Sequence, residues 1–62
     1  MNESDRMRYV VFRNLVGQWQ WKLISPNRRI LAESVERYWK KADCEAGIQL
    51  VKSSVQAPVE EV

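Results

Sequence analysis

One short stretch constrains the fold of this chain more than any other: residues 17–23, which read Gly-Gln-Trp-Gln-Trp-Lys-Leu. Its large apolar residues alternate with polar ones at a spacing of two, the period of a β-strand with one buried face. Trp19 and Trp21 therefore lie on the same side of a strand, and each indole can bury roughly 150–250 Å². We expect a sheet whose core is organised around these two tryptophans.

The size of the chain limits how it can become stable. Its 62 residues make one small domain, and a hydrophobic fraction of 45% argues for a folded chain and against disorder. A single cysteine, Cys44, excludes an internal disulfide, and the lack of histidine argues against a structural zinc site. Small domains without such links gain stability by association. We therefore expect a homodimer.

Three strands are predicted in the first half of the chain. Residues 9–12 are β-branched and aromatic, and the tryptophan strand runs over residues 18–25. A third strand is predicted over residues 29–34. Turn-forming residues separate the strands at 14–17 and 25–27. Connections this short join neighbouring antiparallel strands, so the pattern predicts a three-stranded meander.

The period of the apolar residues then changes to that of a helix over residues 41–53. Three apolar residues on one helical face are expected to meet the sheet: Cys44, Ile48 and Val51. Gly47 lies in the middle of this helix, where glycine costs up to ~1 kcal/mol relative to alanine. We expect the helix to approach the sheet closely at Gly47, against a tryptophan ring.

The remaining residues complete an α+β domain of order β-β-β-α-β. Residues 55–59 are predicted as a short last strand, confined to a sheet edge or a strand end by Pro58, which has no N–H to donate. The expected organisation is a flexible lead over residues 1–6, a single domain over 7–59 and an acidic tail over 60–62.

The alternation of the strands also predicts the two faces of the sheet. The residues expected to face the helix are Tyr9, Val11, Trp19, Trp21, Leu23, Ile30 and Ala32. The main core anchors among these and the helix are Trp19, Trp21, Leu23, Ile30, Ile48 and Val51. The other face is expected to carry Val10, Phe12, Gln18, Gln20, Lys22, Arg29, Leu31 and Glu33. The phase of the first strand stays open, because its central residues are all apolar.

A wider motif resembles a known family. Gly17-x-Trp19-x-Trp21-x-Leu23, followed by Ile30-x-Ala32-x-Ser34 and Tyr38, is similar to the pattern of the YegP-like proteins, small and mostly bacterial domains of uncharacterised function. The resemblance implies a unit of three strands, a helix and a strand. It also implies that two units form one continuous sheet and exchange their C-terminal strands.

For this chain the resemblance implies a homodimer. Its exchanged strand would carry Val55, Ala57 and Val59. The chain departs from the family in one hairpin, where relatives usually have Asn-Gly and this chain has Asn27-Arg28-Arg29. That hairpin is therefore expected to be longer or differently shaped. The resemblance implies no catalytic residues.

The composition argues against an enzyme. Without histidine, neither a Ser-His-Asp nor a Cys-His arrangement can be built within one chain. Cys44 falls on the predicted buried face of the helix, where a thiol behaves as a small apolar group. Gly17 and Gly47 are isolated, so no glycine-rich phosphate loop exists. We expect no catalysis, no cofactor and no metal site, and a structural or protein-interaction module whose protein partner is unknown.

Nucleic-acid binding is the alternative function. Residues 6–59 carry ten cationic and four acidic side chains, and some sheet proteins read DNA with an open face. The candidate contacts are Gln18, Gln20, Lys22, Arg28, Arg29, Lys40 and Lys41. Val10, Phe12 and Leu31 on the same face are poor neighbours for phosphate and favour contact with protein.

The expected location follows from the start of the chain, from its apolar runs and from its single cysteine. The start of the chain is polar and mixed in charge, and no apolar run approaches the ~20 residues needed to span a bilayer. With a lone thiol, these features lead us to expect a cytoplasmic protein that makes no membrane contact. Trp39 has three candidate places: against the start of the helix, at the dimer interface, or beneath a stacked ligand.

Overall fold

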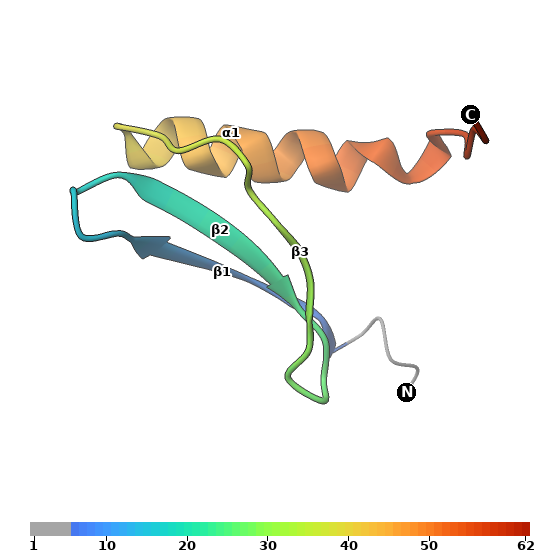
Figure 1. Cartoon of the computed structure of the whole chain (residues 1–62), viewed down its shortest axis with the longest axis horizontal. Coiled ribbons are helices and arrows are strands. Elements are labelled where there is room, and N and C mark those ends of the chain that lie inside the picture. Colours follow the sequence, from blue (N-terminus) through green and yellow to red (C-terminus); the bar gives the residue numbers. More distant parts are fainter. Residues whose placement is uncertain (1–5) are drawn as a thin grey trace.

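The structure, a computed structural model, describes residues 6–62, so most of the expected N-terminal lead lies outside the described residues. Within these residues three antiparallel strands form one sheet in chain order: β1 (Arg8–Arg13), β2 (Trp19–Ile24) and β3 (Ile30–Glu33). A helix, α1 (Lys41–Lys52), lies across one face of the sheet (Figure 1). A short 3₁₀ helix, η2 (Ser53–Gln56), follows it. The predicted α+β class, with a three-stranded meander and one helix, is confirmed.

The turn between β1 and β2 is built around Asn14. The backbone N–H of Asn14 donates to the Gln18 carbonyl at 2.8 Å, and its side-chain Oδ1 accepts from the N–H groups of Val16 and Gln18. Gly17 closes the three-residue loop with a φ of 88°, in the left-handed region that glycine occupies at no steric cost. This is the three-residue hairpin in which a turn is followed by a left-handed residue.

The turn between β2 and β3 repeats this design with other residues. Ser25 takes the place of Asn14: its N–H donates to the Arg29 carbonyl at 2.9 Å, and its Oγ accepts from the Arg29 N–H at 3.1 Å. Arg28 takes the place of Gly17, with a φ of 66°. The hairpin at Asn27-Arg28-Arg29 therefore has the same loop length as the first hairpin of this chain. Arginine instead adopts a conformation that suits glycine.

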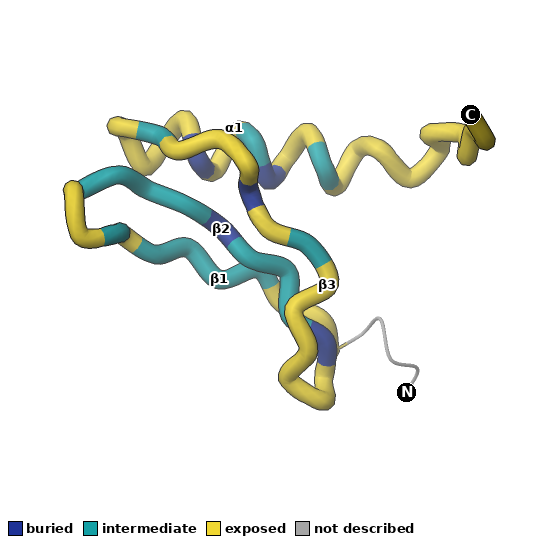
Figure 2. The backbone as a smooth tube through the Cα atoms, in the orientation of Figure 1, coloured by how far each residue is buried: buried dark blue, intermediate teal, exposed yellow. Residues whose placement is uncertain are grey.

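The core lies between β2 and α1. Three of the apolar residues that the structure describes are buried: Trp21, Cys44 and Ile48. Around them pack the half-buried residues Tyr9, Val11, Trp19, Leu23, Ala32, Tyr38 and Val51. The Tyr9 ring meets the Trp21 ring edge to face, with 5.7 Å between centroids. The phase of β1 follows from these contacts: Tyr9 and Val11 face the helix. Figure 2 shows most of the buried positions where α1 crosses the sheet; buried Ser25 lies apart from them, at the β2–β3 hairpin.

The prediction that Ile30 belongs to this core is wrong for the described chain. Ile30 is 54% exposed. The register between β2 and β3 shifts at Leu23 and Ile24, so Ala32 pairs with Leu23 while Ile30 pairs with Ile24. Because paired residues share a face of the sheet, the shift moves Ile30 to the side away from α1.

The chain remains attached to β2 after β3 ends. Ser34 donates its N–H to the Trp21 carbonyl at 2.9 Å, and its Oγ accepts from the Trp21 N–H. Further on, Tyr38 and Trp19 exchange two backbone hydrogen bonds, of 2.6 and 2.9 Å. Between these two attachments the chain has three exposed residues, 35–37, where β2 has only Gln20, so it forms a bulge there.

Gly47 lies where the helix touches the sheet most closely. A Cβ placed on Gly47 would lie 2.5 Å from the Tyr38 hydroxyl oxygen and 3.6 Å from the Trp21 indole nitrogen. The close approach to a tryptophan ring expected at this glycine is therefore present, with Tyr38 as the tighter neighbour.

The predicted last strand is not formed by this chain alone. Residues 53–56 belong to η2, and residues 57–62 have no regular secondary structure. A strand needs a neighbour for its backbone hydrogen bonds, and no segment of the described chain lies beside these residues as a strand.

Candidate functional site

The C-terminal arm, residues 53–62, carries apolar side chains that are not packed against the rest of the described chain. Val55 is 83% exposed and Val59 is 99% exposed. Leu50, in the last turns of α1, is 73% exposed and extends this apolar surface into the helix. The arm leaves α1 at the end that extends past the sheet, and the chain ends away from the core (Figure 1). Contact with a partner surface would bury these apolar side chains and so stabilise the arm.

The sheet offers two edges to a partner. β1 and β3 each pair with β2 alone among the described residues, so each has one row of backbone groups without a strand neighbour. β1 has six residues and β3 has four. An added strand would therefore find the longer template along β1.

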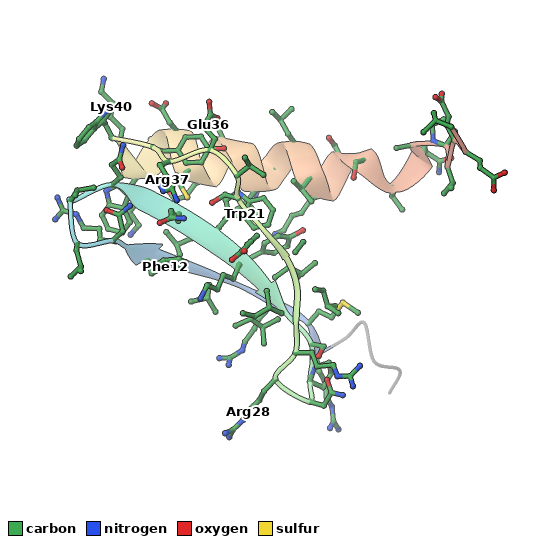
Figure 3. All side chains as sticks on the ribbon, in the orientation of Figure 1. Phe12, Trp21, Arg28, Glu36, Arg37 and Lys40 are labelled. Atoms are coloured by element: carbon green, nitrogen blue, oxygen red, sulfur yellow. The ribbon has the colours of Figure 1, made fainter. Side chains whose placement is uncertain are left out.

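The side of the sheet away from α1, called here the open face, is more apolar than the sequence pattern predicts. The cross-strand pairs place Arg8, Val10, Phe12, Gln20, Lys22, Ile24, Ile30 and Glu33 on it. The Lys22 ammonium lies 5.0 Å from the centroid of the Phe12 ring, so its stem covers part of the apolar surface. In Figure 3, Phe12 lies on the side of the sheet opposite Trp21.

The residues proposed for nucleic-acid contact do not form one surface. Arg28 and Arg29 are exposed at the tip of the β2–β3 hairpin. Lys40 lies at the start of α1, at the other end of the molecule from Arg28 (Figure 3). Lys41 lies next to it in the chain, with its Nζ 5.6 Å from the Trp19 ring centroid. This wide separation weakens the case for a single phosphate-binding track.

The amides proposed for base contact are partly engaged within the protein. The Gln20 Oε1 accepts a hydrogen bond of 3.1 Å from the Asn14 side chain, and both residues are half-buried. Gln18 lies outside β2, where its backbone closes the first hairpin. Lys22 lies on the open face between them and the second hairpin, over Phe12. The open face therefore does not present a row of free amides.

Two ionisable groups in the core have perturbed pKa values. Burial raises the pKa of the Cys44 thiol, and the negative charge of Glu45 raises it further. Burial also raises the pKa of the Tyr38 hydroxyl, helped by the carboxylate of Glu36. Both groups stay protonated at neutral pH, so neither supplies an anionic nucleophile or base.

Pocket and metal chemistry find no support in residues 6–62. No cavity suited to a small molecule is found there. Nor do three or more histidine, cysteine, aspartate or glutamate side chains come together in that range as metal ligands would. None of the helices formed by these residues combines the length and apolarity that crossing a bilayer requires.

Sequence reasoning missed one surface. Leu15 and Val16, in the β1–β2 turn, are 106% and 68% exposed, and Trp39 before α1 is 71% exposed. The available signal was the presence of two apolar residues between the turn-forming Asn14 and Gly17. Hydrophobic residues in a tight turn have no strand or helix face to bury them.

Comparison with known proteins agrees with this picture of a small domain without an evident catalytic site. A family model described as a domain of unknown function, DUF1508, matches residues 16–61. UPF0339 protein NMB1088 of Neisseria meningitidis serogroup B is 33% identical over 57 residues, covering 90% of this chain and 100% of that protein. A serogroup A counterpart, NMA1193/NMA1859, matches equally well. A solution NMR structure of a protein from Haloferax volcanii aligns over 100% of both chains, with a TM-score of 0.85 and 33% identity.

Proposed function

Because the chain belongs to the DUF1508 family, the YegP-like domains of unknown function, we propose that it is a homodimeric interaction module without catalytic activity. In this proposal each chain lends its C-terminal arm to the sheet of the other. The dimer then presents a longer sheet to further protein partners. Neither the family description nor the names of the relatives indicates a reaction.

The exposed arm is the observation that carries the proposal. Val55, Ala57 and Val59 follow one another at a spacing of two, the period of a strand with one apolar side. All three are exposed in the single chain. Pro58 falls between them and fits an edge position, because it donates no hydrogen bond there. A second copy would give these residues both a strand neighbour and an apolar surface.

The small size of the core also supports association. Only Trp21, Cys44 and Ile48 are buried apolar residues within residues 6–62. Several large apolar side chains stay outside this cluster, among them Leu50 at 73% and Ile30 at 54% exposed. Domains of this length bury too little apolar area alone to be strongly stable, and association adds to it.

We also propose a cytoplasmic location. The state of the Cys44 thiol supports this location, and it supports the absence of catalysis as well. Cys44 is fully buried and unpaired. Its raised pKa keeps it protonated, and reactive cysteines instead lie exposed in electropositive surroundings. A free structural thiol suits a reducing compartment.

The oligomeric state tests the proposal. Analytical ultracentrifugation at 10–100 µM (about the range where weak dimers form) should give a dimer for the full chain. A truncation that removes residues 55–62 should give a monomer or an unfolded chain, and the matched truncation of residues 60–62 should remain dimeric. A folded monomer for the full chain at the highest concentration would contradict the proposal.

A second measurement keeps the test decisive if the long truncation does not fold. Full-length chains labelled with ¹³C and unlabelled chains are mixed, unfolded and refolded together. Isotope-filtered NMR should then detect contacts between Val59 of one copy and β1 of the other. A dimer without such contacts would contradict the exchange of arms while leaving association intact.

A further inference from the structure

We propose that one end of the molecule binds the surface of an anionic lipid bilayer. This end, called here the tip surface, consists of the exposed apolar residues Leu15, Val16 and Trp39 and the exposed cations Arg13, Lys40 and Lys41. The association is peripheral and needs no spanning segment. It differs from the expectation of no membrane contact, which rested on the lack of a long apolar run.

The backbone brings the two halves of the tip surface together. Tyr38 and Trp19 are joined by two backbone hydrogen bonds, so the segment that starts α1 runs beside the start of β2. The β1–β2 turn and the first residues of α1 consequently lie at the same end of the molecule (Figure 1). Side chains from both segments meet at one ring: the Arg13 guanidinium lies 5.3 Å, and the Lys41 ammonium 5.6 Å, from the Trp19 centroid.

The apolar half of the tip surface protrudes and is not concave. Leu15 is 106% exposed at the apex of a tight turn, with Val16 beside it at 68%. Trp39 contributes an indole that is 71% exposed. No cavity is found anywhere in residues 6–62 that would receive a small molecule or a peptide side chain. A protruding aliphatic and indole group suits insertion at the boundary between headgroups and acyl chains.

The charged half favours an anionic surface. Arg13, Lys40 and Lys41 are all exposed, and the acidic residue in the first turn of α1 is Asp43. Two of these cations are held around the single Trp19 ring, so they repel one another. An anionic partner relieves this repulsion. Lysine and arginine near a negatively charged leaflet each contribute about 1 kcal/mol of attraction.

Lipid explains the whole set of residues better than nucleic acid does. Single-stranded nucleic acid stacks its bases on a series of aromatic rings along a basic groove. The tip surface offers one well-exposed ring, Trp39, and no groove. Fully exposed aliphatic residues such as Leu15 have no role against phosphates, whereas an acyl-chain boundary accepts them.

Vesicle sedimentation tests the proposal with the full-length protein. We expect binding to vesicles of phosphatidylcholine and phosphatidylglycerol in equal parts, and little binding to phosphatidylcholine alone. Binding should weaken clearly between 50 and 300 mM salt (roughly a fall in screening length from above 10 Å to a few Å). The double substitution Lys40→Gln and Lys41→Gln should weaken it by about 25-fold, at about fivefold for each lysine.

Matched variants separate the tip surface from general charge and hydrophobicity. Arg28→Asn with Arg29→Gln removes the same charge at the far hairpin and should leave most binding intact. Trp39→Ser should abolish measurable binding at 300 mM salt, whereas Leu31→Ser, an exposed apolar change on β3, should not. Thermal melting checks that every variant is folded.

Three results would overturn the proposal. The first is equal binding, or none, to the two vesicle types. The second is an equal loss of binding in the Arg28–Arg29 and Lys40–Lys41 variants. The third is retention of single-stranded DNA through Trp39 and Lys40 without vesicle binding, which would assign the tip surface to nucleic acid. Because none of these readouts depends on arm exchange, failure here leaves the dimer proposal untouched.

Discussion

The hydroxyl of Tyr38 occupies the space that a side chain on Gly47 would need, 2.5 Å from the position of such a Cβ. The glycine is in the middle of α1, where alanine would be the better helix former. The sequence therefore gives up helix propensity in order to seat the tyrosine between the helix and β2. The contact also brings Tyr38 beside the Trp21 indole, at the centre of the core.

We predict that Gly47→Ala destabilises the domain. Alanine gains up to ~1 kcal/mol in helix propensity, but the overpacking against Tyr38 costs about 1–3 kcal/mol. Denaturant unfolding measures the difference. In a Tyr38→Phe background the nearest atom is gone, so most of the loss should disappear in a double-mutant cycle. An additive cycle would mean that the tyrosine does not cause the loss.

The second hairpin should be improvable by one substitution. Arg28 has a φ of 66°, a region that costs an L-residue roughly 1–2 kcal/mol. Arg28→Gly removes this strain but loosens the unfolded chain, so the net gain should be about 0.5–1 kcal/mol. Gly17→Ala, at the equivalent place in the first hairpin, should lose about 1 kcal/mol. Thermal melting of the two variants should thus move in opposite directions.

Trp21 and Trp39 should differ sharply in their effect on stability. Trp21 is 6% exposed at the centre of the core, so Trp21→Ala should cost about 3–5 kcal/mol and unfold a domain of this size. Trp39→Ala, at 71% exposed, should change the free energy of unfolding by no more than about 0.5 kcal/mol. Circular dichroism melts of both variants check this. A normal melt for Trp21→Ala would contradict the placement of this residue at the centre of the core.

Stability should fall at alkaline pH. The pKa of Cys44 is raised from its usual 9.0 and that of Tyr38 from its usual 10.0, in both cases first by burial. The folded protein binds these two protons more tightly than the unfolded chain does, which adds to the free energy of unfolding. This contribution is complete below the pKa values of the unfolded chain and is lost as the pH rises through the higher pKa values of the folded protein. The melting temperature should therefore begin to fall near pH 9.0 and fall further above pH 10.0.

A variant without the thiol provides the control. Cys44→Ala should lose the first part of the alkaline fall and keep the part due to Tyr38. In the parent chain the thiol should react with a disulfide reagent only on unfolding, because Cys44 is 0% exposed. Rapid labelling of the folded protein would show that the thiol is accessible after all.

The sequence predicted the three strands, the helix and most of the core, because these follow from local periodicity. The alternation around Trp19 and Trp21 predicts a strand with both indoles facing the helix, and the spacing of Cys44 and Ile48 predicts the helical face that meets them. The close approach at Gly47 was also foreseeable, since a glycine in a helix centre needs a reason. What could not be foreseen was that the neighbour would be Tyr38, which comes from a bridge outside the regular strands.

The wrong prediction that Ile30 belongs to the core has a different origin. A period of two assigns Ile30 and Ala32 to one face, but it holds only while each strand residue pairs with one partner. The shift at Leu23 and Ile24 breaks that condition, and it arises from hydrogen bonding between strands that no local pattern encodes. The last strand stays a prediction, because the neighbour that we propose for it belongs to a second copy of the chain.

The bulge at residues 35–37 has a practical consequence. The chain is fastened to β2 on both sides of it, by Ser34 at Trp21 and by Tyr38 at Trp19. Residues inserted between these two hydrogen-bonded attachments have room to project outward, and the hydrogen bonds of Ser34 and Tyr38 to β2 stay as they are. A short epitope or a fluorescent reporter could therefore be inserted there while the side chains packed between the sheet and α1 keep their arrangement.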